Sequence, residues 1–154
     1  MIQLTQAVVA PEGNHPEGAE VYEIPTTQRV VCPDFTFFEA SCLFAALEKS
    51  RRWERFVGEF PVVSPTDEDS WVAQMSERMV SLLADLADED VEVTAKHLSR
   101  LTKKEVEWTL NASEELIQSL RPLSKAAISK GEKVYLWQTT NLDVYTENGA
   151  NKAE

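Results

Sequence analysis

The side chains best suited to covalent or metal chemistry in this sequence are two histidines, His15 and His97, and two cysteines, Cys32 and Cys42. A histidine can act as a general base or a metal ligand near neutral pH, and a cysteine beside a basic group can act as a nucleophile. No Cys-x-x-Cys or His-Glu-x-x-His motif surrounds them. We therefore expect surface or packed histidines, a core position for Cys42, no catalytic residue, no metal ion and no cofactor.

Carboxylates are the other group that is concentrated enough to suggest a function. Residues 66–92 contain nine acidic side chains and one arginine, whereas residues 93–133 have a net charge of +3. The densest run comprises Asp85, Asp88, Glu89, Asp90 and Glu92. We interpret these five residues as a candidate binding surface for a basic partner. The competing interpretation is a solvated helix junction, because acidic side chains also stabilise the start of a helix.

A formal net charge of −11 at pH 7 argues against contact with polyanions. Such a charge repels nucleic-acid backbones and anionic lipid headgroups. Residues 91–121 contain a short basic run and invite comparison with a helix-turn-helix, but the glutamates that follow favour a solvated helical core. DNA contact is a minor alternative, and we expect neither direct nucleic-acid binding nor membrane binding.

The chain has the composition of a folded intracellular domain, with 154 residues of which 43% are hydrophobic. Its first residues lack the basic and apolar segments of a secretory signal, and no stretch approaches the roughly 18 apolar residues of a membrane span. We expect a cytoplasmic protein with two free cysteines. A single domain over residues 1–140 is predicted, followed by a flexible polar tail at 141–154.

The elements that must position these side chains follow from hydrophobic spacing and turn residues. Short runs rich in β-branched and aromatic residues predict strands at 2–10, 21–24, 29–31 and 133–138. Apolar residues at three-or-four spacing predict helices at 36–57, 70–87, 91–101 and 113–129. The predicted fold is α+β, a helix-rich domain whose small sheet is built from N- and C-terminal strands.

Local signals define the expected helix ends. Thr36 with Glu39, and Thr102 with Glu105, have the spacing of a capping box, in which side chains satisfy the free backbone amides of the first turn. Pro122 should break or kink its helix, and Gly131 should end it.

These observations favour a noncatalytic acidic protein-binding module. It would be an inhibitor, an immunity-like antagonist or an adaptor of a basic or nucleic-acid-binding protein. A first alternative is a phage or macromolecular-assembly component, such as a tail-assembly chaperone or connector. A second is a small enzyme that uses Cys32, Cys42 or His97 without a linear motif, which a deep pocket converging on those residues would support.

Overall fold

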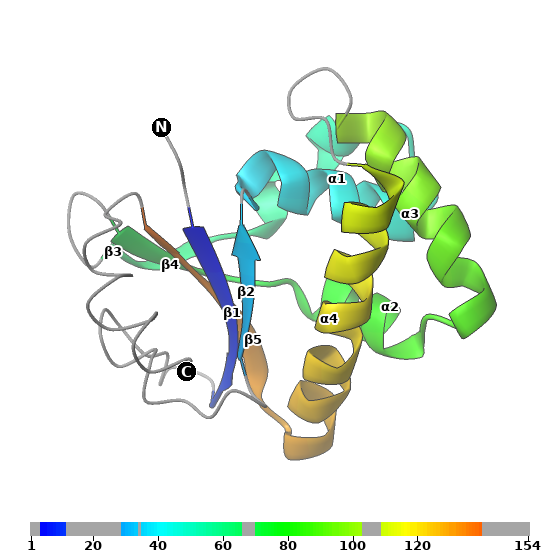
Figure 1. Ribbon diagram of the computed structural model, residues 1–154. Helices are drawn as coiled ribbons and strands as arrows, with labels where there is room; N and C mark the ends of the chain where they lie inside the picture. The colour runs from blue at the N-terminus through cyan, green and yellow to red at the C-terminus, as the bar shows by residue number, and fades with distance from the viewer. Residues whose placement is uncertain (1–3, 12–28, 34, 66–69, 103–108, 140–154) are drawn as a thin grey trace.

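One antiparallel sheet is covered on one face by a layer of helices (Figure 1). The computed structural model describes residues 4–11, 29–33, 35–65, 70–102 and 109–139. In chain order the elements are β1 (Leu4–Ala10), β2 (Arg29–Pro33), α1 (Phe37–Leu47), the 3-10 helix η3 (Trp53–Glu59), β3 (Val62–Pro65), β4 (Ser70–Gln74), α2 (Glu77–Asp85), α3 (Asp88–Thr102), α4 (Leu110–Lys130) and β5 (Lys133–Thr139). The predicted α+β class is confirmed.

The strands lie in the order β2-β1-β5-β4-β3, and every neighbouring pair is antiparallel. The C-terminal strand β5 pairs with β1 along its whole length, with Val8 opposite Tyr135 and Leu4 opposite Thr139. This confirms the prediction that the strand near 133–138 lies beside an N-terminal strand. The sheet is wider than predicted because β3 and β4, from the middle of the chain, extend it beyond β5.

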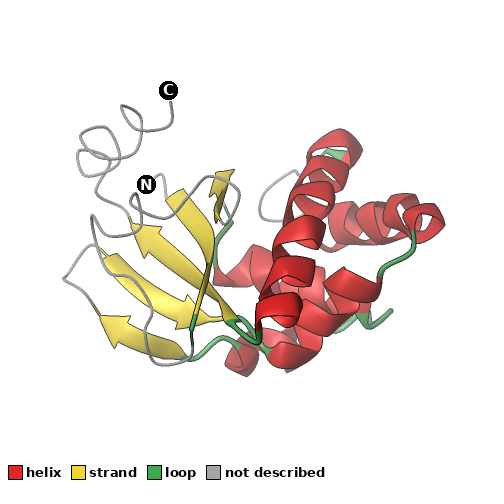
Figure 2. Ribbon diagram, turned by 90° about the horizontal axis from the view of Figure 1, so that it is seen from below, coloured by secondary structure: helices red, strands yellow, loops and turns green. Residues whose placement is uncertain are grey.

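Side chains alternate between the two faces of the sheet, as the pleat requires. Ala7, Ala73 and Leu136 face the helical layer and belong to the main core. A second buried cluster consists of Val8, Ala10, Val72, Tyr135 and Trp137. Figure 2 shows the sheet and the helical layer side by side. Among the described helices, none combines the length and the apolar character needed to span a bilayer.

The helix predicted at 36–57 is wrong in its second half. Helix α1 ends at Leu47, and the chain turns at Lys49, whose φ is 60°. The following aromatic residues fold back as η3, where Trp53 packs edge-on against Phe38 with ring centroids 4.8 Å apart. The apolar residues in 53–60 therefore share the core with α1 without continuing its helix. At the start of α1, Thr36 caps no backbone amide, and its hydroxyl donates to the Glu39 carboxylate.

The helix predicted at 70–87 is also wrong in its first part, because residues 70–74 form strand β4. Tertiary pairing with β5 decides the conformation here, with Trp71 opposite Gln138. The indole nitrogen of Trp71 donates a hydrogen bond to the Gln138 side chain, which fixes this register. Helix α2 then begins after Ser76, whose hydroxyl accepts a hydrogen bond from the amide of Arg78 at 3.2 Å.

The helices predicted at 91–101 and 113–129 correspond to α3 and α4, but the observed helices begin and end at other residues. Thr102 lies in the last turn of α3, where its hydroxyl donates to the Leu98 carbonyl at 3.0 Å. Thr109 caps α4 instead, by accepting from the amide of Ala112 at 3.1 Å. At Pro122 the sequence predicts a break or a kink; because Pro122 lies within the continuous helix α4, the break does not occur.

Gly131 ends α4 as predicted, in the left-handed conformation with φ of 66°. Other predictions fall outside the described residues. These are the strand at 21–24, the capping role of Glu105, the environment of His15 and the tail at 141–154.

Candidate functional site

The five predicted site residues come together at the junction of α2 and α3. Asp85 is the last residue of α2, and Asp88, Glu89 and Asp90 form the first turn of α3, with Glu92 following. All five side chains are exposed. We call this group, Asp85, Asp88, Glu89, Asp90 and Glu92, the acidic corner.

Two members of the acidic corner have partners among the described residues. A carboxylate oxygen of Asp88 lies 2.8 Å from Nη2 of Arg121, and Glu92 forms an ion pair with Lys96 at 3.1 Å, one turn along α3. The side chains of Asp85, Glu89 and Asp90 form no hydrogen bond or ion pair with the described part of the chain. Three carboxylates of the acidic corner are therefore exposed and unpaired within the described residues.

Arg121 stabilises the turn between α2 and α3 on which the acidic corner lies. This arginine lies on α4 and is buried, with 8% of its surface exposed. Its Nη2 donates to the Leu86 carbonyl at 2.7 Å, and its Nη1 donates to Oε1 of Gln118 at 2.9 Å, while its Nε has no hydrogen-bond partner in the described part of the chain. Since Leu86 lies between α2 and α3, Arg121 fixes the chain at the point where the acidic corner turns.

The role of Arg121 was missed in the sequence. A signal for it exists, because Arg121 stands four residues after Ile117 and next to Leu120, on the buried and mostly apolar stripe of α4. A charged residue on such a stripe indicates a partnered buried charge. The identity of its partners could not be predicted, because they come from a distant part of the chain.

Helix electrostatics explain only part of the acidic corner. Asp88, Glu89 and Asp90 lie in the first turn of α3, where each carboxylate is stabilised by about 0.3–1 kcal/mol through the helix dipole. Asp85 has the opposite placement, because it ends α2, whose last turn has no basic residue. A negative charge there opposes the dipole, so helix stabilisation does not account for Asp85.

The two cysteines occupy positions that disfavour nucleophilic chemistry. Cys32 on β2 and Cys42 on α1 are both free and buried. Burial raises the pKa of each thiol to about 12, and the charges of Glu39 and Glu54 add to the effect at Cys42. Because the thiolate is the reactive form, both groups are inert near neutral pH.

His97 lies half-buried on α3. Burial is the main cause that lowers its pKa below 6.5, and the positive charges of Arg100 and Arg51 lower it further. A hydrogen bond with the backbone of Ser50 acts in the opposite direction. His97 is therefore a neutral side chain at pH 7 in a locally basic environment.

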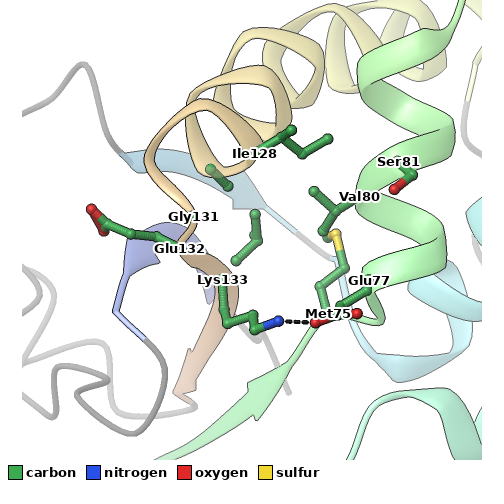
Figure 3. Close-up of a pocket in the computed structure, with 10 residues that line it drawn as sticks. Met75, Glu77, Val80, Ser81, Ile128, Gly131, Glu132 and Lys133 are labelled. Carbon is green, nitrogen blue, oxygen red and sulfur yellow. Dashed lines mark hydrogen bonds and ion pairs between the residues drawn. The ribbon is translucent and has the colours of Figure 1, made fainter.

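A shallow pocket of about 210 Å³ lies between α2, the end of α4 and the start of β5 (Figure 3). Met75, Val80 and Ile128 surround it, and Lys133 reaches across to form an ion pair with Glu77. This pocket is not lined by Cys32, Cys42 or His97. Within the described ranges, no three His, Cys, Asp or Glu side chains are grouped as metal ligands would be.

Comparison with protein-family models, curated proteins and solved structures finds no match to this chain. The assignment of a function therefore rests on the geometry of the acidic corner.

Proposed function

We propose that this chain is a noncatalytic protein-binding module that uses the acidic corner to engage a basic surface of a partner protein. Such a partner would itself bind nucleic acid or another polyanion, and the chain would act as its inhibitor, antagonist or adaptor. The partner's lysines and arginines would occupy the positions that phosphates otherwise take, because both contacts depend on the same charges.

One observation carries this proposal, namely that Asp85, Glu89 and Asp90 are exposed and have no hydrogen-bond or ion-pair partner among the described residues. Like charges within a screening length of about 8 Å repel one another. Clustering these carboxylates therefore raises the electrostatic free energy of the chain, and a basic partner would lower it again. The Arg121 contacts add support because they hold the turn between α2 and α3 in one conformation. A charged surface that is already ordered loses little entropy on binding.

The chemistry of the remaining candidates also supports a binding role. The thiols of Cys32 and Cys42 are protonated and buried, and His97 lies away from the pocket near Lys133. In the described part of the chain, the exposed charged surface is therefore better placed to contact another molecule than the candidate nucleophiles are to react with one.

The test compares two triple variants that change the net charge equally. The corner variant is Asp85→Asn, Glu89→Gln and Asp90→Asn, which leaves the ion pairs of Asp88 and Glu92 intact. The control variant neutralises three exposed glutamates elsewhere: Glu54→Gln, Glu59→Gln and Glu115→Gln. Wild type and both variants are used as bait in an extract of the native host.

We expect a basic protein to be retained by wild type and by the control variant and to be lost by the corner variant. With that protein purified, the corner substitutions should slow association by about tenfold at low salt and flatten its salt dependence, because charge complementarity acts mainly on encounter. Equal retention by all three baits, or an unchanged salt dependence, would reject the acidic corner as the binding surface.

A further inference from the structure

The exposed face of α3 has a pattern that is not explained by the packing of this helix within the chain. Glu89, Val93, Lys96 and Arg100 follow one another at spacings of four, three and four residues, so they lie on one face of the helix, and all four are exposed. The opposite face, with Val91, Ala95 and Leu98, is buried in the core. Helix α3 lies on the outer side of the helical layer, away from the sheet (Figure 1).

Charge is segregated along this face. Its N-terminal half has Glu89, and its C-terminal half has Lys96 and Arg100. Between them, Val93 is 67% exposed, the largest exposed fraction of any large hydrophobic side chain in the described ranges. At 1.5 Å per residue, Glu89 and Arg100 are separated by about 16 Å along the helix axis.

We propose that this face binds a second copy of the chain, with the two α3 helices packed antiparallel about a twofold axis that passes between Val93 and Lys96. This arrangement places Glu89 of each copy opposite Arg100 of the other. Val93 then packs against Val93 of the other copy and against the aliphatic part of Lys96. The antiparallel direction also brings the positive end of each helix dipole beside the negative end of the other.

A second copy fits this face because the pattern is complementary to itself. In a parallel pair, the acidic halves would face one another, whereas the antiparallel pair matches acid with base twice. Within the described part of the chain, the side chains of Glu89 and Arg100 have no hydrogen bond or ion pair. Among the described residues, Lys96 is held only by Glu92, in an exposed pair one turn away, and such pairs contribute little, so Lys96 can exchange partners. Twofold dimers with a self-complementary patch are the commonest oligomers.

This inference does not depend on the proposed function, although Glu89 belongs to both surfaces. The dimer requires Val93 and Arg100, which the acidic corner does not include. Asp85 and Asp90 are required for the basic partner and lie outside the dimer stripe. Changing Asp85 and Asp90 to Asn should therefore leave self-association unchanged, so a failure of one proposal is distinguishable from a failure of the other.

The first test is analytical ultracentrifugation of the purified full chain over a range of concentrations. Wild type should show a monomer–dimer equilibrium. Glu89→Arg and Arg100→Glu should each weaken the dimer by at least about tenfold, because each places like charges in contact twice. The double variant Glu89→Arg, Arg100→Glu should recover the wild-type dimer. An equimolar mixture of the two single variants should form a heterodimer with about wild-type affinity, although each variant alone dimerises at least about tenfold more weakly than wild type.

The second test traps the contact covalently. Val93→Cys should form a disulfide-linked dimer on mild oxidation, whereas Val57→Cys, at an exposed position on η3, should not. The native cysteines are buried and do not compete. The proposal is overturned if wild type is monomeric at every concentration, if charge reversal at both positions gives no recovery, or if the two cysteine variants cross-link equally.

Discussion

The guanidinium of Arg121 contacts the carboxylate of Asp88 at 2.8 Å, yet the two side chains lie in opposite environments. The side chain of Arg121 is 9% exposed and that of Asp88 is 90% exposed. The ion pair thus crosses the boundary between the core and the solvent. Substitution of Arg121 should therefore destabilise the fold more than substitution of Asp88. Removing the buried residue leaves buried polar groups without hydrogen bonds, whereas the exposed carboxylate is solvated by water in either case.

We predict that Arg121→Met lowers the free energy of unfolding by about 1–3 kcal/mol, since it removes the hydrogen bonds to the Leu86 carbonyl and to Gln118 as well as the ion pair. Asp88→Asn should cost less than about 1 kcal/mol, because its side chain is solvated. Arg121→Lys should fall between them, since lysine keeps the charge but lacks the planar fork. Urea denaturation measures all three, and equal losses for Arg121→Met and Asp88→Asn would contradict the anchoring role.

A second prediction concerns the thiols. Cys32 and Cys42 each have a pKa raised from 9.0 to about 12 by burial, so the folded state keeps protons that the unfolded state releases. The stabilising contribution is complete below pH 9 and is lost as the pH rises from 9 towards 12. Urea midpoints should therefore fall over this range.

The variant Cys32→Ala, Cys42→Ala serves as the control, because it retains every other group that titrates at high pH. Its stability should fall less steeply above pH 9 than that of wild type. Ellman's reagent provides an independent measurement, with no reaction in the folded protein at neutral pH and both thiols reacting in denaturant. Rapid modification of the folded protein would show that the thiols are accessible.

The elements near the chain ends and the later helices could be predicted from the sequence because their local patterns agree with their packing. The strand predicted at 133–138 is β5 (Lys133–Thr139), and the helix predicted at 113–129 is α4 (Leu110–Lys130). In α4, the apolar stripe and the terminal glycine both favour the helix, and together they outweigh Pro122, whose ring and missing amide favour a break. Agreement among such signals is what makes a segment predictable.

The middle of the chain could not be predicted because two periods overlap in it. Trp71 and Met75 fit a helical spacing, but Trp71, Ala73 and Met75 equally fit the alternation of a strand. The pairing of β4 with β5, which is more than sixty residues away in the chain, selects the strand. Local periodicity has no information about that partner.

The acidic corner was predictable as a group because its members are close in sequence. The role of Arg121 could not be predicted, since its contact with the α2–α3 turn joins segments that only the folded chain brings together. The pattern on the outer face of α3 was available in the sequence, but its exposure became evident only when the opposite face was found packed in the core.

A third prediction follows from the environment of His97. Its pKa is lowered below 6.5, first by burial and then by the charges of Arg100 and Arg51. The unfolded state therefore binds more protons than the folded state just below pH 6.5, and the free energy of unfolding should fall as the pH decreases through that window. His97→Gln should reduce this loss, which urea denaturation at a series of pH values measures.

The cause of the His97 shift can be tested by an NMR titration of its ring protons. Arg100→Gln should raise the pKa of His97, because it removes a repelling charge, but should not restore 6.5, because burial is the larger cause. Arg55→Gln removes an equal charge from an exposed position on η3. Because Arg55 is not among the groups that shift the pKa of His97, this variant should leave that pKa unchanged. The two arginine variants therefore separate a local interaction from a change in net charge. If wild-type His97 titrates at or above 6.5, the environment described for α3 is wrong.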